Sequence, residues 1–291
     1  MAIATVARDV FTCNSEKTQL IFLDYIASRF TTNLGFVLEN SSNAIGMGAN
    51  GNSYTGKRRL VSLNYSPNST NTKDKVFFDI QAFQHFLKFA ISDSLTEANI
   101  ALGQVANSPY DGYGLYNFNL TTGDPIIFHS FNHPEIKAVT LTQGYTGLHL
   151  SLAIIKPSGK PSWWNEADSL YSFMSIHPVG GAGLTMYTAY YNLLASKNAC
   201  SVNFGYNSQS SFVTSNPITG LRSMIGGFNI VANESEGNRG GVVGTVSSDL
   251  AYVNATGLNI NSIIQVQGST ARYQTLAKSD NNPVLAVKVV D

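Results

Sequence analysis

Charged residues are scarce in this sequence. Asp, Glu, Lys and Arg make up 12% of the 291 residues, about half the share that is usual in globular proteins. The 18 basic and 18 acidic residues cancel to a formal net charge of zero. A neutral surface gives no electrostatic attraction to nucleic acid or anionic lipid, so we expect neither a nucleic-acid nor a membrane partner. It also gives little repulsion between copies, so self-association is expected.

The sequence has only two cysteines, and its first residues do not have the pattern of an export signal. Cys13 and Cys200 lie far apart beside apolar residues, and we expect two buried thiols rather than a disulfide. Residues 1–9 place their charges after a short apolar run, which is the wrong order for a signal peptide. No apolar run approaches the length of a transmembrane helix. We therefore expect a protein without a signal peptide.

No catalytic motif is complete. Residues 157–159 come nearest to a serine-nucleophile turn, but they lack its first glycine and the helix that follows it. The glycine-rich residues 46–51 lack the strand, the helix and the Gly-Lys-Ser/Thr ending of a phosphate-binding loop. Nothing in the spacing selects a pair for glycoside cleavage among the scattered acids, Asp111, Asp124, Glu166 and Asp168. We predict no enzyme, no catalytic residue and no cofactor.

His129, His133 and Glu135 are the best candidates for a metal site, and His149 could join them from the next strand. Two histidines four residues apart share one face of a helix. Here the apolar residues 126–128 and Pro134 instead predict a strand followed by a turn, which would separate the two rings. The alternative is that these are ordinary hydrogen-bonded or surface histidines, and the sequence leaves open whether they bind a metal.

Strand signals dominate the C-terminal end. Three β-rich runs, residues 258–266, 271–277 and 284–290, are separated by Gly-Ser-Thr and by Asp-Asn-Asn-Pro. Short runs with such breaks predict an antiparallel meander in which the last strand is paired. Further strands are predicted at residues 126–131, 136–141, 148–155, 170–176, 199–206, 224–232 and 241–246.

The N-terminal half combines helix and loop signals. Apolar residues at helical spacing from Leu20 to Phe30, with Ser15 as the N-cap and residues 33–35 as the stop, predict a helix that is apolar over more than half its circumference. Such a helix is either buried in the fold or docks one flank, which includes Ile21, on a neighbouring subunit. Residues 40–55 are rich in Asn, Ser and Gly and predict a long loop. The basic run 57–59 begins a strand and is interpreted as protection of a sheet edge. Asp79 is predicted to cap a short helix that reaches residue 90, and residues 92–106 could continue as helix.

These elements predict a mainly β protein, an antiparallel sandwich or barrel-like fold with two or three short helices. The N-terminal half would have α+β character. The Pro- and Gly-containing residues 156–161 predict a domain boundary. The expected domains are an α+β domain with long Asn/Gly loops, residues 1–160, and an antiparallel β domain, residues 161–291.

Aromatic side chains on Gly- and Asn-rich segments are the predicted contact surface. Such segments are typical of protein and sugar contacts, although the rings could equally cover a sheet. The residues are Tyr110, Tyr113, Tyr116, Trp163 and Trp164.

The low charge, the Asn/Ser/Thr/Gly polarity and the many short strands resemble virion proteins of tailed bacteriophages. The resemblance lies in residues 40–54, 224–246 and above all 263–290, and it contains no diagnostic motif. It implies a repeated, non-catalytic building block of the tail, baseplate, neck or capsid surface, made in the host cytoplasm and located in the virion. Its partners would be copies of itself and other virion proteins. The alternative is an adhesin-like β domain that binds a receptor or a host-surface glycan through the exposed aromatics.

Overall fold

The computed structural model describes a protein built mainly from antiparallel sheets. The described residues are 3–12, 19–46, 55–64, 75–83, 86–92, 125–143, 149–159, 162, 173–178, 185–188, 201–203, 222, 224–227, 229–232, 241–254, 257–276 and 283–291. Within these ranges the chain forms one α-helix and three sheets. The predicted mainly β, antiparallel class is therefore confirmed, whereas the prediction of two or three helices is not.

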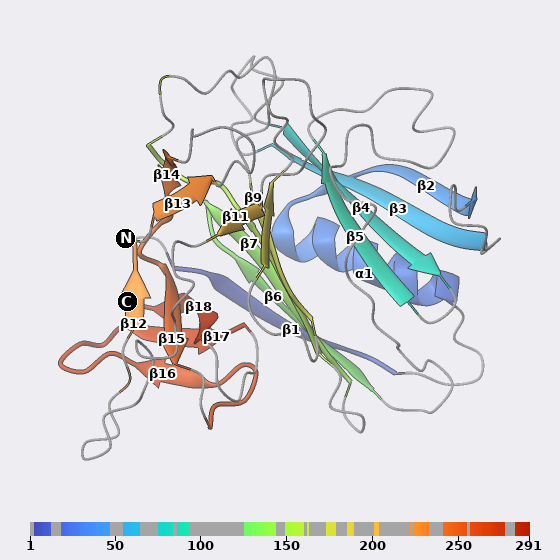
Figure 1. Ribbon diagram of the computed structural model, residues 1–291. Coiled ribbons are helices and arrows are strands. Elements are labelled where there is room, and N and C mark those ends of the chain that lie inside the picture. Colours follow the sequence, from blue (N-terminus) through green and yellow to red (C-terminus); the bar gives the residue numbers. More distant parts are fainter. Residues whose placement is uncertain are drawn as a thin grey trace.

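A nine-stranded sheet runs through the middle of the molecule (Figure 1). The N-terminal strand forms one edge of this sheet and pairs with a strand from far along the chain, since Thr5 lies opposite Asn132. In spatial order the strands are β1 (Thr5–Phe11), β6 (Ile126–Asn132), β7 (Ile136–Gln143), β8 (His149–Ile155), β9 (Phe173–Pro178), β10 (Thr185–Thr188), β11 (Ser201–Asn203), β13 (Asn229–Ala232) and β14 (Gly241–Thr245).

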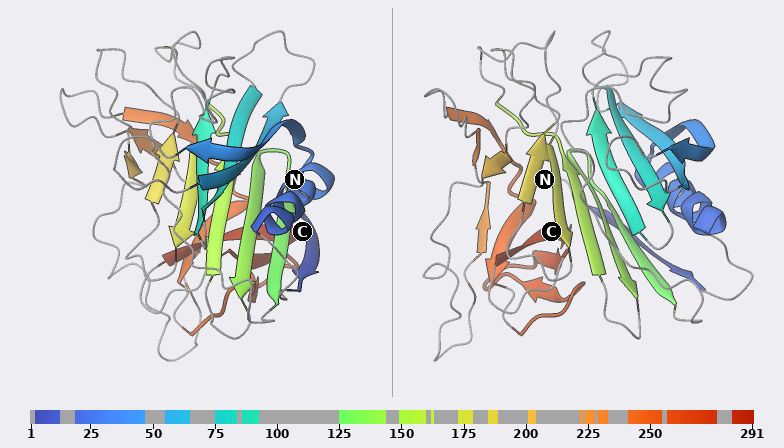
Figure 2. Two further views of the ribbon diagram at one scale, coloured as in Figure 1. Left: turned by 90° about the vertical axis from the view of Figure 1, so that its right-hand side faces the viewer. Right: turned by 45° about the vertical axis from the view of Figure 1, so that its right-hand side comes forward.

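Two smaller sheets lie on either side of the nine-stranded sheet (Figure 2). The four-stranded sheet contains β2 (Val37–Gly46), β3 (Thr55–Asn64), β4 (Lys75–Phe83) and β5 (Phe86–Ser92), in that order. The five-stranded sheet has the order β12 (Met224–Gly226), β15 (Leu250–Asn254), β18 (Pro283–Val290), β17 (Arg272–Thr275) and β16 (Ile263–Gln265).

The helix α1 (Gln19–Leu34) ends as the sequence predicts. Gly35 has a φ of 77°, the left-handed conformation that glycine adopts without strain just after a helix. The face that carries Phe22, Ile26 and Phe30 is buried, whereas Ile21 on the other side is 41% exposed. The predicted N-cap Ser15 lies outside the described residues. The periodicity therefore identified the helix and the core of its buried face, Leu23, Ala27 and Phe30, but Ile21, which the apolar pattern included, is exposed.

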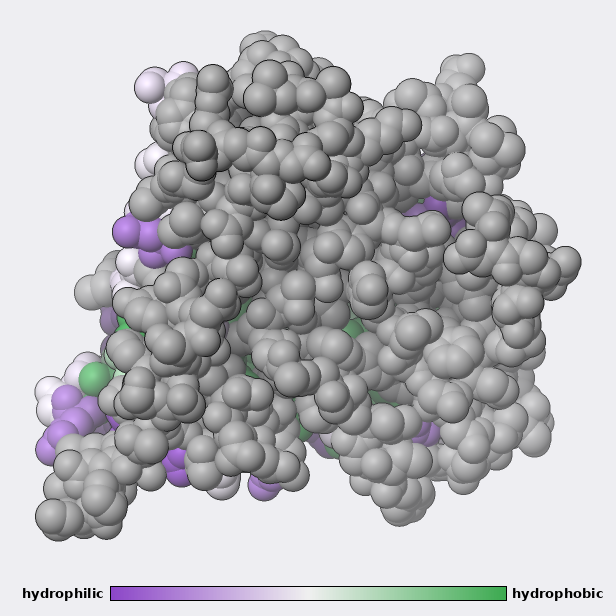
Figure 3. Space-filling model, in the orientation of Figure 1, coloured by the Kyte–Doolittle hydropathy of each residue, from purple (hydrophilic) through white to green (hydrophobic). Residues whose placement is uncertain are grey.

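Two apolar clusters join the layers. The first packs α1 and the four-stranded sheet against one face of the nine-stranded sheet, through residues such as Phe30, Phe78 and Phe128. The second packs the five-stranded sheet against the opposite face, through residues such as Phe131 and Leu285. The nine-stranded sheet is therefore the middle of three layers. In the space-filling view the described residues that reach the surface near the five-stranded sheet are mainly hydrophilic, with small apolar areas among them (Figure 3).

Two predictions for the N-terminal half are wrong. The segment that follows Asp79, predicted as a helix, forms the hairpin β4–β5, in which Phe83 lies opposite Phe86. Residues 40–46, predicted as part of a long loop, belong to β2 and pair with β3 through two register shifts. Their Asn and Ser residues suit a strand at the edge of a sheet, because one side of such a strand has no neighbouring strand.

The basic run at the start of β3 does not protect a sheet edge. β3 lies between β2 and β4, and both arginines are buried. Arg58 Nη2 lies 2.6 Å from Asp79 Oδ2, and Arg59 Nε lies 2.5 Å from Asp24 Oδ1 of α1. The two side chains point to opposite faces because they are adjacent in a strand. Arg59 thus ties the sheet to the helix, and Arg58 binds the neighbouring strand.

The predicted C-terminal meander is confirmed. β16, β17 and β18 are consecutive antiparallel neighbours, and β18 also pairs with β15, so the last strand lies inside its sheet. The nine-stranded sheet contains strands from both sides of residue 160, and β8 pairs with β9 along six residue pairs from Leu150 to Ile155. The division into domains at residue 160 remains a prediction.

Candidate functional site

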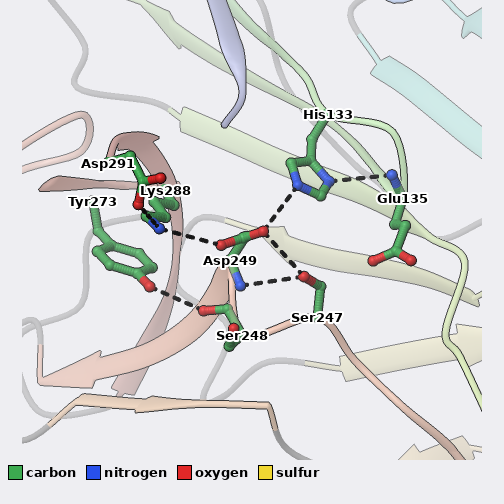
Figure 4. A network of polar contacts seen from close by, with 8 residues as sticks. All are labelled: His133, Glu135, Ser247, Ser248, Asp249, Tyr273, Lys288 and Asp291. Atoms are coloured by element: carbon green, nitrogen blue, oxygen red, sulfur yellow. Dashed lines mark hydrogen bonds and ion pairs between the residues drawn. The ribbon is translucent and has the colours of Figure 1, made fainter. Parts of the chain in front are cut away.

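A cluster of polar side chains lies where the five-stranded sheet meets the β6–β7 turn (Figure 4). The turn begins at His133, whose backbone exchanges hydrogen bonds with Ile136. Pro134 suits its second position because the ring fixes φ near the required value. The backbone N–H of Glu135 donates to His133 Nδ1 at 3.1 Å. Nδ1 therefore carries no proton, and in the neutral ring the proton is on Nε2.

His133 Nε2 faces Asp249 across the two sheets. The proton on Nε2 points to Asp249 Oδ2, and the two atoms lie 3.3 Å apart. Asp249 belongs to the turn before β15, where Ser247 Oγ donates to the same oxygen at 3.3 Å. His133 and Asp249 are 1% and 5% exposed. Burial of a carboxylate is costly unless hydrogen bonds or an opposite charge compensate it. The contact between His133 and Asp249 is one such hydrogen bond, and it holds the β6–β7 turn against the five-stranded sheet.

Lys288 supplies the opposite charge. It is a buried residue of β18, and its Nζ lies 3.7 Å from Asp249 Oδ1 and also contacts Asp291 Oδ1. The hydrogen bond to Asp291, with the charges of Asp291 and Asp249, raises the pKa of Lys288 above its usual value in spite of burial. The same hydrogen bond lowers the pKa of Asp291. Nearby, Tyr273 donates to the Ser248 carbonyl at 3.0 Å. The cluster thus combines charge pairs with hydrogen bonds, although Asp249 Oδ1 accepts no hydrogen bond and faces Lys288 only as an ion pair.

The order of the groups does not match a serine nucleophile. In such a site the histidine lies between the serine and the carboxylate and removes the proton from the serine. Here Asp249 lies between Ser247 and His133, and the second ring nitrogen of His133 is occupied by a backbone N–H. The arrangement is suited to joining the two sheets rather than to proton transfer.

A second polar group joins the same two sheets around His129. Asn261 Nδ2 lies 3.0 Å from His129 Nδ1, while Asn261 Oδ1 accepts from Thr140 Oγ1 and Gln274 Nε2, both at 3.3 Å. Ser151 Oγ of β8 also donates to the Leu276 carbonyl. The sheets are therefore joined by polar contacts beside the apolar cluster.

The predicted metal ligands have separate partners. His129 contacts Asn261, and His133 contacts Asp249. The side chain of His149 lies outside the described residues. Within the described part of the chain, no three His, Cys, Asp or Glu side chains form a group that could hold a metal ion.

Other predicted residues cannot be placed. The predicted contact surface, Tyr110, Tyr113, Tyr116, Trp163 and Trp164, lies outside the described residues, as do Asp111, Asp124, Glu166, Asp168, Cys13 and Cys200.

Sequence reasoning missed Asp249 and Lys288. Lys288 interrupts the apolar run Val284–Val290 of a strand predicted to be paired, and a lysine there needs a buried partner. That signal indicates a partner but does not identify it, since Asp249 lies in a distant turn, the one before β15.

Comparison with known proteins finds neither a family model nor a curated sequence that matches this chain. Among the described residues, no helix is both long enough and apolar enough to cross a membrane.

Proposed function

We propose that the chain is a repeated, non-catalytic structural component of a tailed-bacteriophage virion, part of the tail, baseplate, neck or capsid surface. The observation that carries the proposal is how the charged and polar groups are used in the described layers. Arg59 joins a sheet to the helix, Arg58 joins two strands, and His133, Asp249 and Lys288 join two sheets. These groups stabilise a layered β structure, as a building block requires. The compositional resemblance to virion proteins supports the particular class.

The edge strand β1 offers a surface for assembly. It is the outermost strand of the nine-stranded sheet, and Val6 and Val10 are 37% and 45% exposed. The strand contains neither proline nor lysine, the residues that commonly protect sheet edges. Asp9 is held by Arg29 and Asn33, so Arg8 is the one exposed charge in this strand. Such an edge suits pairing with a second copy of this chain.

Imaging and sedimentation of the purified protein test the proposal. We expect rings, tubes or defined multimers from the wild type, and the double variant V6K/V10K should dissociate them because the added charges oppose edge pairing. I21K is the matched control, since Ile21 is similarly exposed on α1, and it should assemble normally. A monomer at high micromolar concentration that also lacks a partner in its native particle would count against the proposal. A monomer that binds in a glycan array would instead favour the adhesin-like alternative.

The non-catalytic part of the proposal has a separate test. Single alanine variants of the candidate polar residues should not abolish biological activity while leaving folding intact. The residues are His129, His133, Glu135, His149, Glu166 and Asp168. Thermal melts and an assembly or infectivity assay on the same samples provide the comparison. One variant that melts like the wild type but is inactive would contradict a purely structural role.

A further inference from the structure

His129 lies on the face of the nine-stranded sheet that the five-stranded sheet covers. It belongs to β6, and its neighbours across the ladder are Arg8 on β1 and Thr140 on β7. From the five-stranded side, Asn261 reaches the imidazole ring. The side chain is intermediate in exposure. Because Asn261 contacts the ring directly, the charge state of the ring affects the contact between the sheets.

The hydrogen bonds of Asn261 determine which group faces the ring. Its Oδ1 accepts from Thr140 and Gln274, so Nδ2 is the atom that lies 3.0 Å from His129 Nδ1. An amide nitrogen only donates, and His129 Nδ1 must therefore accept with its lone pair. A proton on Nδ1 would place two N–H groups against each other. The observed contact requires Nδ1 to be unprotonated.

The charges around His129 also oppose protonation. Burial and the positive charge of Arg8 both lower the pKa of His129. The other strand and sheet neighbours, Thr140, Asn261 and Gln274, are uncharged. Asp9 follows Arg8 but lies on the other face of β1, where it pairs with Arg29. His133, by contrast, faces the carboxylate of Asp249.

We infer that His129 is an acid-sensitive contact between the nine-stranded and five-stranded sheets. The five-stranded sheet is held while Nδ1 is unprotonated, and protonation breaks the bond to Asn261 and loosens the sheet. This inference does not depend on the proposed virion function.

The direction of the pH effect follows from linkage. The unfolded histidine has a pKa of about 6.5, and the folded value is lower. The stability from the neutral ring is therefore complete above about pH 6.5. It is lost as the pH falls from there towards the folded pKa, because the unfolded state binds the proton first. At pH 5 one such histidine raises the equilibrium constant for unfolding by at most about 30-fold.

Hydrogen exchange and NMR provide the test on the full chain. Protection factors of residues 257–276 are measured at pH 7 and pH 5, and the His129 ring is titrated by NMR. In the wild type we expect a pKa below 6.5 and lower protection at pH 5. H129Q keeps a neutral acceptor for Asn261, so its protection should depend less on pH. R8Q removes the nearby positive charge and should raise the pKa of His129.

T140V is the matched control. It removes a hydrogen bond to Asn261 without removing a titratable group, so it should lower protection by the same factor at both pH values. If H129Q does not fold, the titrations of the wild type and R8Q still decide the question. A pKa of His129 at or above 6.5 in the folded protein, or equal pH dependence in the wild type and H129Q, overturns the inference.

Discussion

Arg58 Nη2 and Asp79 Oδ2 lie 2.6 Å apart, with side chains 1% and 0% exposed. The two residues belong to adjacent strands, and Leu60 is the residue directly opposite Asp79. The guanidinium therefore reaches diagonally across the β3–β4 ladder. A fully buried pair of this kind depends on both partners, because each charge left alone would have no water to solvate it.

Removal of one partner should be strongly destabilising. R58M leaves the Asp79 carboxylate buried without this cation, and we expect a loss of about 3–5 kcal/mol in the free energy of unfolding. The double variant R58M/D79L removes both charges and should recover much of that loss. Chemical denaturation of the single and double variants measures the coupling.

The Lys75–Glu39 pair provides the control for this prediction. Its Nζ–Oε1 distance is also 2.6 Å, but the side chains are 37% and 25% exposed. Exposed pairs contribute about 1 kcal/mol or less, so K75M should have a small effect. If R58M costs no more than K75M, the buried pair is not the stabilising contact described here.

Phe30 should be among the most sensitive apolar positions. It is 1% exposed, stacks on Phe78 with ring centroids 5.2 Å apart and contacts Phe36 at 5.3 Å. F30A should therefore lower the free energy of unfolding by about 3–5 kcal/mol through lost burial and a cavity. I21A, on the exposed side of the same helix, should change it by about 0.5 kcal/mol or less. Equal effects in thermal or urea denaturation would refute the assignment of the buried face.

Substitution of Gly35 should lower the free energy of unfolding, and the cause should be the backbone conformation alone. A Cβ at this position would meet no atom within 4 Å, but the φ of 77° is unfavourable for side chains. G35A should therefore cost about 1–2 kcal/mol, and G35N should cost less because asparagine tolerates this conformation better. Urea denaturation compares the two variants. A neutral G35A would show that the helix end relaxes to another conformation.

The last strand should be required for folding. Deletion of residues 284–291 removes β18 from between β15 and β17, together with the buried Leu285 and Val287. We expect insoluble protein or the loss of a cooperative thermal transition, because two new sheet edges and an apolar surface are exposed. Deletion of Asp291 alone is the control and should leave the protein soluble. A soluble, cooperatively melting product of the longer deletion would show that β18 is dispensable.

Local signals explain which elements could be predicted from sequence. The end of α1 depends on Gly35, and the β6–β7 turn depends on the adjacent His133 and Pro134. The C-terminal meander is likewise marked by breaks between neighbouring strands. In each of these elements the residues that determine the structure are close in sequence.

The remaining features depend on distant partners. Asp79 was predicted to be a helix N-cap because the apolar spacing after it fits a helix as well as a hairpin. Its partner Arg58 lies on another strand, so the local sequence does not reveal the pair. The contact of His133 with Asp249 joins residues 116 positions apart in the sequence. Composition and periodicity do not report such pairings, so the polar junction between the sheets could not be predicted.

The position of β1 also has a consequence for synthesis on the ribosome. β1 pairs with β6, which is made much later, so the first strand must remain unpaired while the helix and the four-stranded sheet emerge. β18, which is made after the other described strands, then completes the five-stranded sheet, and its Lys288 carbonyl accepts a hydrogen bond from the Ala4 backbone. Such long-range pairings slow folding and leave strand edges open to other chains in the meantime. We therefore expect the emergence of β18, rather than that of the N-terminal half, to limit the rate at which the native sheets form.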